Sequence, residues 1–137
     1  MLIKITPDIE RAKSLMDMAE KREESLKELQ RRINFPTIIA EMYYEIVKEL
    51  VASLLFIDGF KAIGEYAHKE AIDYLSNYGF SHEDLSLLHD LRIRRNKSMY
   101  EGKQINPSYL ENNEKSIVRL IRKLKTLLKF KIKESEK

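Results

Sequence analysis

The residues best suited to chemistry lie in one stretch, from Leu91 to Gly102, which reads L-R-I-R-R-N-K-S-M-Y-E-G. It combines three arginines with an asparagine and a tyrosine. On a helix, residues three and four apart share a face, so four of these side chains would line one strip. Guanidinium, amide and phenol groups together bind phosphate or carboxylate. We therefore predict a phosphate-binding strip that consists of Arg92, Arg95, Asn96 and Tyr100. The alternative is a basic helix face that is exposed to solvent and binds nothing.

A histidine lies on the same predicted strip. His89 precedes Arg92 by three positions, which would place a group with a near-neutral pKa beside phosphate-binding arginines. Acid–base chemistry on RNA requires such a group. The alternative is a histidine paired with an acid such as Asp90 or Glu83. His68, which follows an alanine in another predicted helix, is more typical of a packed histidine at a seam between helices.

Several kinds of site are excluded or disfavoured by what the sequence lacks. Cysteine is absent, which excludes disulfides and thiolate metal sites and fits a cytoplasmic protein. No glycine-rich phosphate loop and no nucleophile elbow occurs. His82 and His89 lack the helical Glu-x-x-His pairing of metal-binding bundles. We therefore expect neither a metal ion nor a cofactor.

The end of the chain is rich in lysine. Cations near the C-terminus of a helix are favoured by the helix dipole, so we interpret these lysines as a solvated face. A surface that guides RNA is the alternative. The lysines concerned are Lys123, Lys125, Lys129, Lys131 and Lys133.

The composition indicates a single folded domain. With 137 residues, of which 43% are hydrophobic and 34% charged, the chain can bury one core and is too apolar to be disordered. The net charge of +3 is small, so nucleic-acid binding would depend on a local cluster of cations. No apolar run is long enough to span a membrane and no signal peptide is recognisable, so we expect a cytoplasmic protein without a membrane partner.

Almost the whole chain is predicted to be helical, because glycine and proline occur only where helices should start or stop. Thr6-Pro7 should open the first helix and Pro36 the second. Ser81 should open the fourth in a capping box with Asp84. We predict an all-α fold, an antiparallel up-down bundle of four to five helices with a core at residues 6–130 and a frayed tail. The expected helices cover about residues 6–32, 36–58, 63–78, 81–102 and 107–128.

Three segments resemble the HEPN domain (higher eukaryotes and prokaryotes nucleotide-binding). They read I-D-G-F-K at the end of the second predicted helix, Y-A-H-K-E-A-I-D-Y-L in the third, and the arginine-rich stretch in the fourth. The resemblance extends from about Thr37 to Leu128, and Arg95-Asn96 matches the opening of the HEPN motif. It implies a homodimer in which the arginine strips of two protomers meet in a cleft. Many members are metal-independent endoribonucleases, often toxins paired with a nucleotidyltransferase antitoxin, and others only bind.

The chain departs from this motif at the histidine. In HEPN ribonucleases a histidine follows the arginine by a few positions, but here Tyr100 takes that place and no histidine follows it. A phenol with a pKa of about 10 is a poor general base near neutral pH, although it can donate a hydrogen bond to phosphate. Catalysis would then depend on Arg95, Tyr100 and His89, with His89 replacing the missing group across a dimer.

Three functions remain open, in this order. The first is a HEPN-like homodimer that binds nucleotide or RNA phosphate in an arginine-lined cleft, with a nucleotidyltransferase-type protein as a candidate toxin–antitoxin partner. The second is a structural interaction module whose basic strip pairs with acids of another subunit, for example Glu45, Glu49 or Asp58. The third is a metal-independent endoribonuclease.

Overall fold

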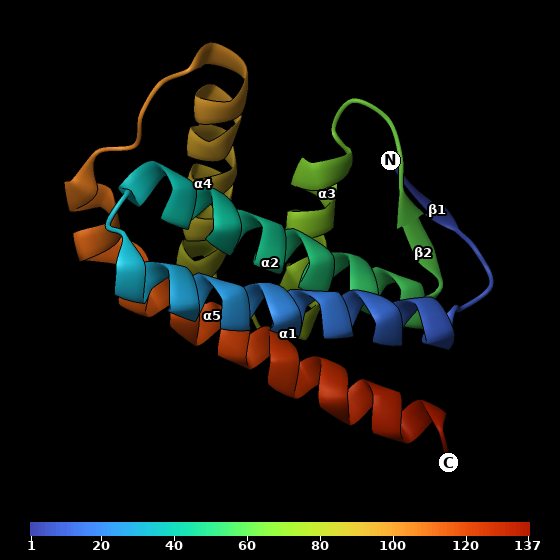
Figure 1. The fold of residues 1–137 in the computed structure, drawn as a ribbon. Coiled ribbons are helices and arrows are strands. Elements are labelled where there is room, and N and C mark those ends of the chain that lie inside the picture. Colours follow the sequence, from blue (N-terminus) through green and yellow to red (C-terminus); the bar gives the residue numbers. More distant parts are fainter.

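The computed structural model describes all residues 1–137 and confirms the all-α prediction: five helices pack against one another (Figure 1). A short 3₁₀ helix, η1, and a sheet of two strands accompany them. No helix combines the length with the apolar character that crossing a membrane requires. The elements are β1 (Leu2–Lys4), α1 (Ile9–Arg32), α2 (Pro36–Asp58), β2 (Phe60–Ala62), α3 (Ala67–Asp73), η1 (Tyr74–Tyr78), α4 (His82–Glu101) and α5 (Pro107–Ser135).

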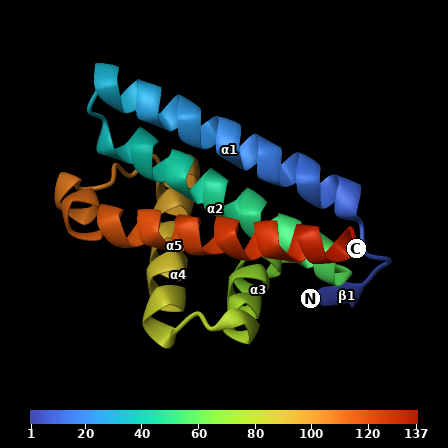
Figure 2. The same cartoon turned by 90° about the horizontal axis from the view of Figure 1, so that it is seen from below.

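α2 is the central helix, because its apolar residues occupy nearly every side. Ile46, Leu50 and Leu54 are completely buried. The helix contacts α1, α3, α4, α5 and β2. Figures 1 and 2 show that α1 and α5 run alongside α2, whereas α3 and α4 stand across this layer and do not continue its up-and-down order. This crossing brings side chains of α2 next to those of both α3 and α4.

Local capping signals explain where the helices begin. The Asp8 carboxylate accepts a hydrogen bond from the backbone N–H of Arg11 at 3.0 Å, so Asp8, and not Thr6 as expected, caps α1. The predicted capping box at the start of α4 is confirmed. Each of its two hydrogen bonds, between Ser81 and Asp84, measures 3.1 Å.

The antiparallel sheet is a feature that the sequence pattern does not predict, because each strand has only three residues. Leu2 pairs with Ala62 in this sheet. Gly59 joins α2 to β2 in the left-handed conformation, with a φ of 80°. A Cβ atom at this position would lie 2.9 Å from the backbone oxygen of Ile5, so glycine is required there.

The third helix is shorter than expected. It starts at Ala67 and passes into the 3₁₀ helix at Tyr74. Ile63, predicted to belong to its apolar face, precedes the helix and is 38% exposed.

The expected fraying of the tail is wrong, because α5 continues to Ser135. Leu128 is buried, and Ile132 packs against the core one turn later. Between them, the Lys131 ammonium lies 2.7 Å from the Asp58 carboxylate at the end of α2. These tertiary contacts stabilise the last turns of α5, and the lysine-rich sequence of the tail does not reveal them.

Candidate anion-binding site

Arg95 lies largely buried between α2 and α4, with 11% of its side chain exposed. Its Nη2 donates to Glu45 at 2.7 Å, and its Nη1 donates to the Asn96 side-chain oxygen at 3.1 Å. The guanidinium also lies over the ring of Tyr44, 5.2 Å from its centre. Asn96 therefore orients Arg95, while Glu45 already balances its charge. An incoming anion would have to share Arg95 with this carboxylate.

Arg92 differs from its neighbours, because it forms no ion pair. Its Nε is buried and has no hydrogen-bond partner. A buried N–H without an acceptor is costly and indicates a group that a ligand or water can satisfy. Burial raises the pKa of Tyr44 to about 12, and the positive charges of Arg95 and Arg92 partly offset this rise. Arg92 thus supplies a guanidinium without an ion-pair partner on α4.

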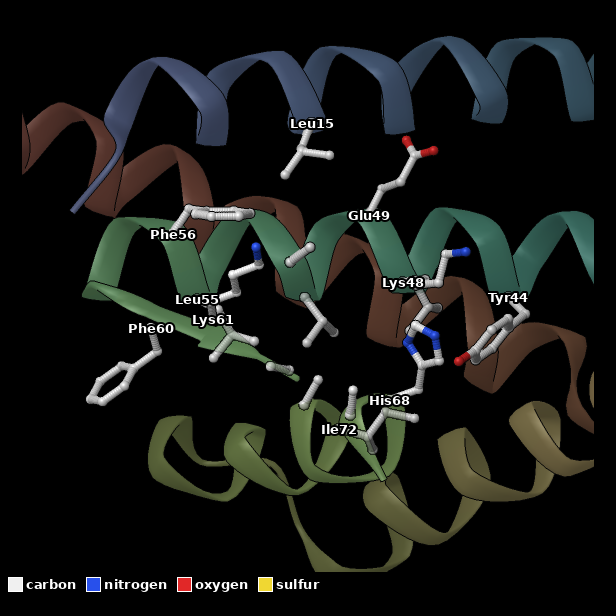
Figure 3. A pocket seen from close by; sticks show the side chains of 16 residues that line it. Leu15, Tyr44, Lys48, Glu49, Leu55, Phe56, Phe60, Lys61, His68 and Ile72 are labelled. Atoms are coloured by element: carbon white, nitrogen blue, oxygen red, sulfur yellow. The ribbon is translucent and has the colours of Figure 1, made fainter. Parts of the chain in front are cut away.

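Two residues that the sequence analysis did not assign to the site belong to it. His68 on α3 faces Lys48 and Tyr44 on α2 (Figure 3). The charges of Lys48, Arg95 and Arg92 all lower the pKa of His68, so these groups share one environment. Tyr44 and Lys48 are four positions apart, which places them on one face of α2. The site, named the cationic cluster from here on, consists of Lys48, His68, Arg92 and Arg95.

Glu45 is the carboxylate that balances part of the cationic cluster. It accepts from Arg95, and its second oxygen lies 3.0 Å from the Lys48 ammonium. Burial disfavours its ionised form, but the contacts with Lys48 and Arg95 outweigh burial and lower the pKa of Glu45. Two lysine or arginine charges therefore remain uncompensated, even when His68 is neutral.

The pKa of His68 is lowered, although the residue is partly exposed to solvent. Burial is the largest cause that lowers its pKa below the ordinary 6.5, and the positive charges of Lys48 and Arg95 add to it. A neutral imidazole beside uncompensated cations can accept a proton or donate one hydrogen bond. An anion bound here would favour the protonated imidazole.

His89 and Tyr100 are not joined to the cationic cluster by any hydrogen bond. The Nε2 of His89 lies 2.6 Å from the carboxylate of Asp73, so His89 is paired with an acid, but with neither of the two that the sequence suggested. Of those, Asp90 pairs with Arg94 at 2.9 Å. Tyr100 is 77% exposed and forms no hydrogen bond with the cluster. The strip predicted on α4 is therefore divided between a buried and a solvent-exposed part.

The acids considered as partners of the basic strip in another subunit all have partners within the same chain. These ion pairs do not need a second subunit and so weaken the purely structural hypothesis. They are Glu45 with Arg95 at 2.7 Å, Glu49 with Arg22 at 2.5 Å and Asp58 with Lys131 at 2.7 Å.

Three of the five lysines considered for an RNA-guiding surface on α5 have partners within the chain. These partners disfavour the guiding of RNA by these three lysines. For two of them the expected solvated face is also wrong, because only 24% of the Lys125 side chain and 22% of the Lys131 side chain are exposed. Lys123 donates to the backbone oxygen of Gly79 at 2.6 Å, Lys125 to Glu23 at 2.8 Å and Lys131 to the hydroxyl of Tyr78 at 2.8 Å.

The cationic cluster is suited to anions and not to metal ions. Nowhere in the chain do three histidine or acidic side chains converge as ligands for a metal. The groups that do converge are hydrogen-bond donors with positive charge, which bind phosphate or carboxylate. Comparisons with protein families, with curated proteins and with solved structures find no match to this chain.

Proposed function

We propose that this protein binds the phosphate of a nucleotide or of an RNA strand through the cationic cluster. The observation that carries the proposal is the Arg92 guanidinium, which has a buried N–H without an acceptor and no ion pair. The charges of Arg92, Arg95 and Lys48 all act on His68, and one carboxylate, Glu45, pairs with both Arg95 and Lys48. Phosphate supplies the missing acceptor and the missing negative charge in one group. The resemblance of Arg95-Asn96 to the HEPN motif supports the same ligand class.

Replacing Arg92 with alanine should weaken phosphate binding about tenfold or more, because a hydrogen bond to a charged group contributes about 1.5–3 kcal/mol. The measurement is fluorescence anisotropy with a labelled single-stranded RNA, together with calorimetry for adenosine monophosphate. Raising the salt concentration should weaken RNA binding by the wild type, with a smaller slope for the variant.

Arg94→Ala is the matched control. Arg94 lies on the same helix, pairs with Asp90 and rests over the ring of Tyr109, 4.4 Å from its centre. Its loss should leave affinity nearly unchanged. Equal affinity of Arg92→Ala and the wild type, with helical circular dichroism intact in both, would remove the proposed function.

Binding should strengthen as the pH falls. The pKa of His68 is lowered below 6.5 in the free protein, and a bound phosphate favours the protonated ring. Protonation and binding are therefore linked, and affinity increases as the pH drops through the pKa of the bound state. Fluorescence anisotropy with labelled RNA between about pH 5 and pH 8 measures this slope, because phosphodiesters stay ionised over this range, whereas a phosphate monoester has a second pKa of about 6. The His68→Asn variant should flatten it, whereas His82→Asn, at the start of α4, should not; an unchanged slope in His68→Asn would assign the proton uptake elsewhere.

We further propose that the protein acts as a homodimer, with the contact beside the cationic cluster. A hollow of about 250 Å³ lies between α1, α2 and α4. Its apolar rim includes Ile38 and Met99, which are 40% and 55% exposed. Both signs of charge line it, among them Arg22 and Glu41. A surface that carries apolar groups and both charges can be complementary to a second copy of itself.

The oligomeric state checks this contact. The wild type should have the molar mass of a dimer by size-exclusion chromatography with light scattering, and Met99→Glu should be a monomer, because it buries a carboxylate in the interface. Ile93→Glu is the control, since Ile93 is 42% exposed on α4 and lines a different hollow. A monomeric wild type, or a Met99→Glu variant that remains dimeric, would contradict the proposed interface.

A further inference from the structure

An apolar cavity opens beside the cationic cluster. Its volume is about 260 Å³, and 12 of its 16 lining residues are hydrophobic. One wall is formed by α2, and the opposite wall is formed by β2 and α3 (Figure 3). The lining residues include Val47 and Val51 of α2 and Ala67 and Ala71 of α3. The small alanine side chains keep α3 from filling the space against α2.

The size of this cavity fits a small organic molecule. A cavity of about 150 Å³ in a protein core is enough to hold benzene, whereas pockets for drug-sized ligands begin at about 300 Å³. With about 260 Å³, this cavity accommodates a medium-length hydrocarbon chain or a substituted ring.

The polar residues around the cavity specify the charge of the ligand. Lys48 and His68 lie at one end, and Lys61, which forms no ion pair, borders the cavity from β2 (Figure 3). The one lining carboxylate, Glu49, points toward α1 and pairs with Arg22 at 2.5 Å. The cavity therefore has positive groups at its edge and no unneutralised negative group.

We infer that this cavity binds the apolar part of a small amphipathic anion, whose charged head contacts Lys48 and His68. The inference shares these two residues with the proposed phosphate site but does not require phosphate binding. Apolar walls contribute about 25 cal/mol per Å² of buried hydrocarbon. A nucleobase is a poorer match, because its polar edge would lose hydrogen bonds to water and find few replacements between Val47, Val51 and Ala71.

Calorimetry with octanoate tests the inference, and octanol and octylamine serve as neutral and cationic controls of the same length. Octanoate should bind the wild type at least tenfold more tightly than either control. Ala71→Phe should abolish octanoate binding by filling the cavity, while it leaves the binding of adenosine monophosphate intact. Lys48→Gln, which leaves the cavity open, should weaken octanoate about tenfold and octanol hardly at all.

Three results would overturn the inference. They are no binding of octanoate by the wild type, equal binding of octanoate and octylamine, and undiminished binding in a folded Ala71→Phe variant. Loss of adenosine monophosphate binding alone bears only on the proposed function, so the two failures are distinguishable.

Discussion

Replacing Asp58 with alanine should lower the free energy of unfolding by about 2–3 kcal/mol, measured by urea denaturation. Asp58 ends α2, and 11% of its side chain is exposed. It accepts hydrogen bonds from the hydroxyls of Tyr74 and Tyr78 in the 3₁₀ helix and from Lys131 on α5. One carboxylate thus joins three separate segments. Its removal leaves a largely buried ammonium without a counter-charge, which costs more than the hydrogen bonds alone.

Asp58→Asn is the matched control, because the amide keeps the size and the acceptor oxygen but loses the charge. It should cost less than the alanine variant. Burial opposes ionisation of Asp58, but its contacts with Lys131, Tyr74 and Tyr78 prevail and lower its pKa below the ordinary 3.8. The stabilisation is therefore present above pH 3.8 and is lost as the pH falls through the lower pKa of the folded state. Equal stability of the wild type and both variants at neutral pH would show that Asp58 does not stabilise the packing of α2 against the 3₁₀ helix and α5.

The helices were predictable because their signals are local. Pro36 and Gly59 mark the two ends of α2, and the capping box of Ser81 and Asp84 marks the start of α4. Each signal depends on residues within one turn of the chain. The strands are too short to show an alternating pattern, and their pairing joins Leu2–Lys4 to Phe60–Ala62, two segments separated by α1 and α2.

The site was only half predictable, for a related reason. Helical spacing shows which residues share a face, and two members of the predicted strip, the neighbours Arg95 and Asn96, are joined by a side-chain hydrogen bond. It does not show which helix lies opposite. His68 and His89 both lie on helices, and the packing of those helices decides their partners. The packing of α3 against α2 brings His68 to Lys48, whereas the packing of α4 against α3 brings His89 to Asp73. Tertiary contacts, which the sequence pattern does not show, therefore decide which histidine belongs to the site.

The same limit applies to the charge of the site. The sequence presents Arg92 and Arg95 as equivalent members of one strip. In the structure, Arg95 is neutralised by Glu45, a residue 50 positions away, while Arg92 remains free. Arg95 is thus already engaged by a carboxylate, and Arg92, one turn earlier, has no ion-pair partner.

Replacing Glu45 with glutamine should therefore tighten phosphate binding while it destabilises the fold. Glu45 occupies Arg95 and Lys48 in the free protein, so it competes with an incoming anion. Its loss frees both cations and removes a negative charge beside the ligand. We expect about tenfold tighter binding, or roughly 1.4 kcal/mol. This is less than the several kcal/mol that two like charges in contact can cost, here the anion and the Glu45 carboxylate. Arg95, now largely buried without a counter-charge, should lower the free energy of unfolding by about 2 kcal/mol.

Anisotropy with labelled RNA and urea denaturation measure these two opposite effects in one variant. Asp90→Asn is the matched control, because it also removes the acid of an ion pair on α4, but that pair, with Arg94, lies outside the cationic cluster. It should change neither quantity appreciably. Since the anion and Glu45 share the same donors, the gain in affinity should be largest at low salt, where charges are least screened. Weaker binding by Glu45→Gln would mean that the carboxylate holds Arg95 in place for the ligand and does not compete with it.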